Sequence, residues 1–150
     1  MPMYPEVMLV PMREELTRAG VQELRSAEEV ASVLDKKEGT VMLVVNSVCG
    51  CAAGKMRPGV RLALDHAKQS GTLPDKAVSV FAGQDREATE KARAYTAPFP
   101  PSSPSIALFK GGKPVYVMHR GDIERRDAMQ IAQLLTEAFN KFCVKETVSA

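Results

Sequence analysis

The hydrophobic positions along the chain follow two periods, and each period predicts a different kind of element. Short apolar runs predict strands, and the runs at 41–45 and 77–82 are typical of strands buried on both faces of a partly parallel sheet. Gly111 and Gly112 separate two further runs and predict a hairpin between them. The five predicted strands are 21–24, 41–45, 77–82, 106–110 and 114–118.

Apolar residues at spacings of three and four predict helices in the segments between these strands. Pro11 lies inside the first helix, so we expect either a kink or a helix that starts near that proline. Ser26 and Glu29 stand at capping-box spacing, and Asp85 is the predicted N-cap of a later helix. The five predicted helices are 4–19, 27–39, 58–70, 86–95 and 124–142.

The order of these elements predicts an α/β fold, with a mixed five-stranded sheet, helices on both faces and an extra helix at the N-terminus. A chain of 150 residues can bury one core, so we expect a single domain over residues 1–150. Ligands and chemistry in such sheets lie beyond the carboxyl ends of parallel strands. The strand 41–45 places Cys49 and Cys51 at such an end.

Composition and charge exclude several classes of function. The chain is 45% hydrophobic and 25% charged with a formal net charge of +2, which is typical of a soluble globular protein. Lys and Arg are interspersed with Asp and Glu, so nothing indicates a nucleic-acid or membrane partner. The N-terminus lacks the pattern of a secretory signal, and the longest apolar run is too short to span a bilayer. We therefore expect a cytoplasmic protein.

The cysteines carry the candidate chemistry. Three is an odd number, which in a reducing compartment favours reactive thiols or metal ligands over structural bridges. Cys49 and Cys51 are separated by Gly50 alone, whereas Cys143 stands at the end of the last predicted helix. We interpret Cys143 as incidental, with a role as an auxiliary resolving thiol or in a homodimer left open.

Three blocks of sequence, in this order, resemble the bacilliredoxin family: 45–54 (VNSVCGCAAG), 80–85 (VFAGQD) and 101–105 (PSSPS). The resemblance covers nearly the whole chain and implies a thioredoxin-like fold. It also implies a thiol-disulfide oxidoreductase that removes bacillithiol, or a similar low-molecular-weight thiol, from oxidised client proteins. Disulfide isomerase is the neighbouring activity. The small thiol would be a co-substrate, and no other cofactor is expected.

Carried onto this chain, the resemblance makes Cys49 the attacking thiol and Cys51 the resolving thiol. It further implies a cis peptide bond before Pro104, facing the active thiol, where free backbone groups could pair with an extended substrate. Ordinary thioredoxins separate their cysteines by two residues, so this chain departs from their pattern. The supporting residues that the resemblance implies are Asn46, Ser47, Gly50, Ser103 and Pro104.

Thiol-disulfide exchange requires a thiolate, which is favoured near a helix N-terminus and near cations. Cys49 precedes a predicted helix, and Lys55 and Arg57 are close in sequence, so we predict a lowered pKa for Cys49. A disulfide across one residue closes a small ring whose strain makes it easy to reduce. This favours isomerase or mixed-disulfide exchange over bulk reduction.

Other interpretations remain open. The pair could be two structural thiols, part of a partner-binding domain without catalysis, or a zinc or copper carrier. Two thiolates supply half of a tetrahedral zinc site, and Cys143, His66 and His119 lie on three separate predicted elements, so we assign no metal site. Lys55 and Arg57 form a solvated rim that would also steer an anionic thiol. Residues 120–122 are predicted to form a turn.

Overall fold

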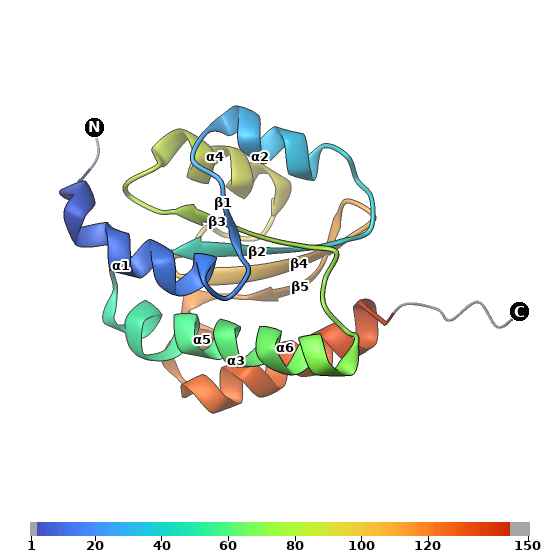
Figure 1. Cartoon of the computed structure of the whole chain (residues 1–150). Helices are drawn as coiled ribbons and strands as arrows, with labels where there is room; N and C mark the ends of the chain where they lie inside the picture. The colour runs from blue at the N-terminus through green and yellow to red at the C-terminus, as the bar shows by residue number, and fades with distance from the viewer. Residues whose placement is uncertain (1–2, 145–150) are drawn as a thin grey trace, which may run out of the picture.

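The computed structural model describes residues 3–144, which form a central sheet with helices on both faces (Figure 1). The helices are α1 (Glu6–Thr17), α2 (Ala27–Leu34), the π-helix η1 (Ala52–Met56), α3 (Arg57–Ser70), α4 (Arg86–Tyr95), α5 (Arg120–Glu124) and α6 (Ala128–Phe142). α2 and α4 cover one face of the sheet, and η1, α3 and α6 cover the other. No helix in this part of the chain is long and apolar enough to cross a membrane.

The strands confirm the predicted mixed sheet and its hairpin. They are β1 (Gln22–Glu23), β2 (Thr40–Asn46), β3 (Lys76–Phe81), β4 (Ser105–Lys110) and β5 (Lys113–Met118). Their order in the sheet is β1-β3-β2-β4-β5. β3 pairs in parallel with both β1 and β2, whereas β4 pairs antiparallel with β2 and β5.

β2 is central and buried over its whole length. Met42 and Val44 pack in the core under α3 and α6, and Leu43 and Val45 pack in the core under α2 and α4. Burying each such side chain contributes about 1.5–3 kcal/mol. Because both cores hold this strand, the turn at its carboxyl end starts from a rigid base.

The closing helix is shorter than the predicted 124–142. Asp127 caps α6 by accepting a hydrogen bond from the Gln130 backbone N–H at 2.8 Å, while Gln130 Oε1 accepts one from the Asp127 N–H at 2.9 Å. This capping box ends the helical run on its N-terminal side. Residues 120–122 therefore lie in α5, a separate short helix, and the predicted turn at this point is wrong.

α2 is also shorter than predicted. It ends at Leu34, and the chain then passes through left-handed backbone at Lys37, with φ of 53°, and at Gly39, with φ of 62°. A right-handed helix cannot continue through such residues. Ser26 is confirmed as the N-cap, because its Oγ accepts a hydrogen bond from the Glu29 N–H, but the capping box is incomplete, since Glu29 Oε1 accepts from the Arg25 N–H and not from the Ser26 N–H.

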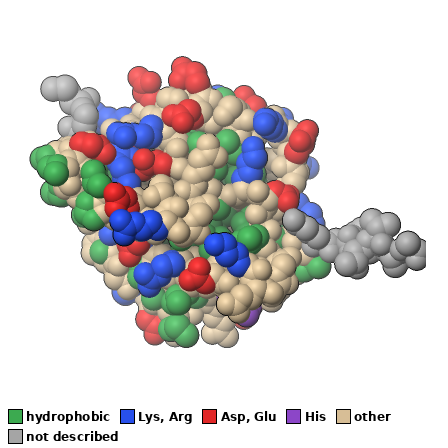
Figure 2. Space-filling view, viewed as in Figure 1, with side chains coloured by type: hydrophobic (Ala, Val, Ile, Leu, Met, Phe, Trp, Pro, Cys, Tyr) green, Lys and Arg blue, Asp and Glu red, His purple; other side chains and the backbone are tan. Residues whose placement is uncertain are grey.

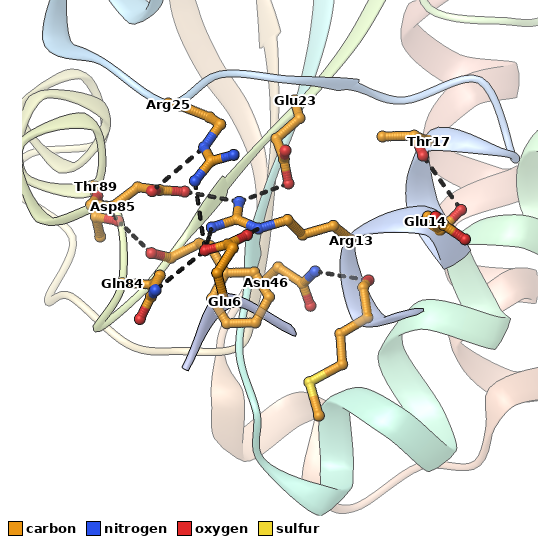
Figure 3. Close-up of polar contacts among 12 residues, drawn as sticks. Glu6, Arg13, Glu14, Thr17, Glu23, Arg25, Asn46, Gln84, Asp85 and Thr89 are labelled. Carbon is orange, nitrogen blue, oxygen red and sulfur yellow. Dashed lines mark hydrogen bonds and ion pairs between the residues drawn. The ribbon is translucent and has the colours of Figure 1, made fainter. Parts of the chain in front are cut away.

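α1 begins at Glu6, so a start near Pro11 is wrong. Arg13, only 6% exposed, fastens α1 to the sheet (Figure 3). Its guanidinium donates hydrogen bonds to Glu6 at 2.7 Å, Glu23 at 2.7 Å and Asp85 at 2.8 Å.

Asp85 stands at the predicted N-cap of α4, but its carboxylate makes no capping hydrogen bond. The charged guanidinium is the stronger donor and takes the carboxylate instead.

The surface mixes charges of both signs. On the face drawn in Figure 2, Lys and Arg side chains lie among Asp and Glu side chains, as the interspersed sequence predicts. Hydrophobic side chains are exposed over α1, where Val7 is 81% exposed.

Candidate active site

The turn after β2 is held by the side chains of Asn46 and Ser47. Asn46 Oδ1 accepts a hydrogen bond from the Ser47 N–H at 2.9 Å, and Ser47 Oγ accepts one from the Cys49 N–H at 3.0 Å. Both side chains are buried. These two residues therefore determine where the backbone of Cys49 lies.

Arg57, the first residue of α3, also holds this turn in place. Its guanidinium donates to Asn46 Oδ1 at 3.0 Å, to the Ser47 carbonyl at 2.9 Å and to Glu15 at 2.6 Å. Arg57 is 3% exposed, so its predicted place on a solvated rim is wrong. Lys55 donates to the Glu124 carbonyl oxygen at 2.6 Å. The two cations predicted beside Cys49 are therefore both bonded to other groups.

Cys49 and Cys51 are free thiols whose sulfur atoms lie 2.8 Å apart, within hydrogen-bonding distance. Gly50, between them, is exposed, and a Cβ built on it would meet nothing within 4 Å. The next residues form η1, an irregular helical turn that the sequence pattern did not indicate. Both thiols are partly exposed and can meet a substrate.

The two thiols differ in acidity. The pKa of Cys49 lies below its ordinary value of 9.0, chiefly because the Cys51 thiol hydrogen-bonds to its sulfur, with smaller contributions from backbone N–H groups and Arg120. This direction agrees with the sequence prediction. Burial raises the pKa of Cys51, and the neighbouring Cys49 raises it further. A thiolate is therefore favoured on Cys49 and disfavoured on Cys51.

Arg120 is the cation that contacts the nucleophile, and sequence reasoning missed it. Its Nη2 donates to Cys49 Sγ at 3.3 Å, its Nη1 to the Ser103 carbonyl at 3.3 Å, and its Nε to Glu124 at 2.5 Å. The hairpin register could have indicated it. Ile106 pairs with Met118, so the residues before β4 lie beside those after β5.

Ser103 and Pro104 lie beside the cysteine turn, as the resemblance implied. The peptide bond between them is cis, and Pro104 is buried. Ser105, the next residue, pairs with Val45 of β2. The structure thus brings all seven predicted site residues to one edge of the sheet.

A cleft of about 410 Å³ opens beside Cys49. Its wall includes Tyr4, whose backbone N–H donates to Gln84 Oε1 and whose carbonyl accepts from Gln84 Nε2, both at 3.0 Å. The N-terminal segment is thereby fastened over the loop that follows β3. Further lining residues are Ser47, Ser103, Arg120 and Arg93.

Cys143 lies at the other end of the sheet. It is 4% exposed and borders Thr40, the first residue of β2, whereas Cys49 follows the last. Burial raises the pKa of the Cys143 thiol. Cys143 is therefore unable to resolve a disulfide on Cys49 in this fold, and its burial disfavours a dimer-forming role.

The metal-carrier interpretation finds no third ligand. Within residues 3–144, no group of three or more His, Cys, Asp or Glu side chains is placed to hold a metal ion. His119 is the N-cap of α5 and lies against Phe99, with ring centroids 6.0 Å apart. His66 lies in the middle of α3.

The amino-acid sequence is similar to a protein family and to several curated proteins over nearly its whole length. A model of the disulphide isomerase family matches residues 4–143. A bacilliredoxin of Koribacter versatilis is 58% identical over 141 residues, which cover 94% of each chain. A bacilliredoxin of Bacillus licheniformis is 48% identical over 140 residues, covering 93% of this chain and 95% of that protein.

Solved structures show the fold. Fasciola hepatica thioredoxin matches with a TM-score of 0.54 at 17% identity, covering 81% of this chain and 99% of that one. Oxidised thioredoxin O1 of Arabidopsis thaliana matches with a TM-score of 0.52 at 14% identity, covering 83% and 98%. The predicted thioredoxin fold is confirmed.

Proposed function

This chain belongs to the bacilliredoxin family of thioredoxin-fold thiol-disulfide oxidoreductases, and on that premise we propose that it removes a low-molecular-weight thiol of the bacillithiol type from S-thiolated cytoplasmic proteins. The observation that carries the proposal is the unequal thiol pair. Cys49 has a lowered pKa and borders the cleft. Cys51 has a raised pKa, and its sulfur lies within hydrogen-bonding distance of the Cys49 sulfur.

The reaction begins at Cys49. Its thiolate attacks the sulfur of the small thiol in the mixed disulfide with the client, forming a new S–S bond to Cys49. The client cysteine leaves as a thiolate and takes up a proton. Arg120 holds the Cys49 thiolate through its N–H at 3.3 Å, and both residues line the cleft.

Cys51 resolves the adduct on Cys49. Once deprotonated, its sulfur attacks the Cys49 sulfur, and the small thiol leaves as a thiolate. The two cysteines are now joined in a disulfide and have supplied the two electrons that reduced the client. The raised pKa of Cys51 keeps it protonated until the charge on Cys49 is lost to the mixed disulfide, because a neighbouring thiolate disfavours a second one.

The disulfide isomerase activity expected beside it needs Cys49 alone: its thiolate attacks a disulfide of the client, bonds to one client sulfur and releases the other as a thiolate. A bridge across one residue closes a small ring, so its formation is disfavoured relative to the wider ring of a two-residue spacing. The mixed disulfide between Cys49 and the client then lives longer, until another client thiolate attacks the client sulfur, forms a new client disulfide and releases the Cys49 thiolate. This supports exchange over net reduction.

The test is intact mass spectrometry of the Cys51→Ser variant after incubation with a bacillithiol-capped protein. We expect one bacillithiol adduct on the variant and release of the client thiol, because no resolving thiol remains. Peptide mapping should place the adduct on Cys49. The double variant Cys51→Ser with Cys143→Ser is the control and should carry the same adduct. An unmodified Cys49 in the presence of capped client would contradict the proposal.

A further inference from the structure

The cleft beside Cys49 is lined by two cations from different elements. Arg120 comes from α5 after the hairpin, and Arg93 comes from α4 on the opposite face of the sheet. No Asp or Glu is among the described residues that line this cleft. Elsewhere on the surface, charges of both signs are mixed (Figure 2). The charged side chains among the described lining of this cleft are therefore both cationic, and Cys49 lies in the same lining.

Arg120 is committed to groups of the protein. Its guanidinium hydrogen-bonds to Cys49, to the Ser103 carbonyl and to Glu124. These contacts use donors on all three nitrogens, and the Glu124 carboxylate already neutralises part of its charge. Two of its five N–H donors stay unused, but the Glu124 carboxylate and the Cys49 thiolate balance its charge, which weakens its attraction for an anion on the substrate.

Arg93 is in the opposite state. Its Nε is shielded from solvent and has no hydrogen-bond partner among the residues that the structure describes. None of the ion pairs between described residues involves it. The side chain as a whole is half-buried and lines the cleft, so its guanidinium brings to the cleft a charge that no described carboxylate balances and that an anion there can pair with. The side chain also borders the pocket under Pro100 and Pro101, so packing restricts it.

We propose that Arg93 binds a carboxylate of the low-molecular-weight thiol while the sulfur of that thiol reacts with Cys49. The inference rests on the proposed function and names the group by which the site recognises its small thiol. A guanidinium matches a carboxylate with two parallel N–H···O bonds, which fix orientation as well as charge. Arg93 is thus a specificity residue, and an uncharged thiol on the same client gains nothing from it.

The test compares one client protein capped in two ways, with bacillithiol or with bacillithiol whose carboxylates are methyl esters. We measure kcat/KM of decapping for the wild type, Arg93→Gln, Arg93→Lys and Arg86→Gln. Arg86 is the matched control, an exposed arginine on the same helix that does not line the cleft. We expect Arg93→Gln to slow removal of the acidic cap by about 10-fold or more, since a charge-assisted hydrogen bond is lost.

The ester cap should be removed at the same rate by all four proteins, and Arg93→Lys should retain part of the preference for the acidic cap. Equal slowing of both caps in Arg93→Gln would overturn the inference, because it would show a structural role or recognition of the client. If Arg93→Gln does not fold, the wild type alone decides, since equal rates on the two caps would overturn the inference. A wild type that removes neither cap would instead overturn the proposed function.

Discussion

Arg13 and Arg120 are two arginines in opposite surroundings. Arg13 is 6% exposed, and its guanidinium lies among the carboxylates of Glu6, Glu23 and Asp85 (Figure 3). Arg120 is exposed, has one carboxylate partner, and points another N–H at Cys49. Arg13, surrounded by carboxylates, serves stability, whereas Arg120, which faces a thiol, serves chemistry.

The two arginines also hold different segments in place. Arg13 joins α1, β1 and the start of α4, which lie on different parts of the chain. Arg120 joins α5 to the Ser103 carbonyl and to the sulfur of Cys49. Removing either arginine therefore removes a link between distant segments. Only the segments that Arg120 joins include the reacting Cys49.

The largest effect is expected for Arg13→Met. The substitution removes the cation that hydrogen-bonds to Asp85 and Glu23, whose side chains are 9% and 18% exposed, and leaves Asp85 only the longer contact with Arg25 at 3.6 Å. We expect the free energy of unfolding to fall by about 3–5 kcal/mol, as measured by urea denaturation, because a buried charge without a partner is strongly destabilising. The alkylation rate of Cys49 in the folded variant should be unchanged.

Arg18→Met is the matched control on the same helix. Arg18 is 80% exposed and pairs with Glu14 across one helical turn, a kind of pair that contributes about 1 kcal/mol or less. A loss for Arg13→Met no larger than for this control would show that the Arg13 cluster does not fasten α1 to the sheet.

A smaller effect, on chemistry alone, is expected for Arg120→Gln. The parent and the variant are both measured without Cys51, so the Cys51 hydrogen bond is absent from both, and Arg120→Gln should raise the pKa of Cys49 by removing the guanidinium. The rate of Cys49 alkylation by iodoacetamide is measured against pH in a Cys51→Ser and Cys143→Ser background, with and without Arg120→Gln. The inflection of this pH profile should lie at higher pH when Arg120→Gln is present. At neutral pH we expect a several-fold slower reaction.

Arg125→Gln is the control for charge, since Arg125 follows α5, is 72% exposed and pairs with Asp122. It should leave the alkylation profile in place. An Arg120→Gln profile that coincides with that of Arg125→Gln would contradict the role of Arg120 in holding the thiolate.

The smallest effect on stability is expected for Cys143, the buried thiol at the other end of the sheet. Burial, with Asp75 nearby, raises its pKa above the ordinary 9.0, so the folded state retains the proton that the unfolded state loses. The resulting stability is present below pH 9 and is lost as pH rises toward the folded-state pKa. In Cys143→Ala, the urea midpoint should therefore fall less steeply from about pH 8 to about pH 10 than in the wild type.

The lowered pKa of Cys49 has the opposite effect on how stability depends on pH. Its lowered pKa adds stability as pH rises from its folded-state pKa toward 9.0, so Cys49→Ala should lose that gain. Identical pH dependence of Cys143→Ala and the wild type would show that the buried thiol is not linked to folding.

Much of the fold could be predicted from the sequence because hydrophobic period and turn residues act locally. The buried run 41–45 became the central strand β2, and the glycines at 111 and 112 became the hairpin. The cysteine pair after that strand, the bracing residues Asn46 and Ser47, and the cis bond before Pro104 lie where the sequence or the resemblance placed them.

Only the tertiary structure decided which charges meet. Sequence proximity indicated Arg57 beside Cys49, but the fold buries Arg57 beneath the turn and brings in Arg120 from 71 residues away. Asp85 likewise bonds to Arg13, 72 residues away, instead of capping its own helix. Hydrophobic patterns determine elements one segment at a time, whereas a charged side chain pairs with whatever strand register and helix packing place within about 3 Å of it.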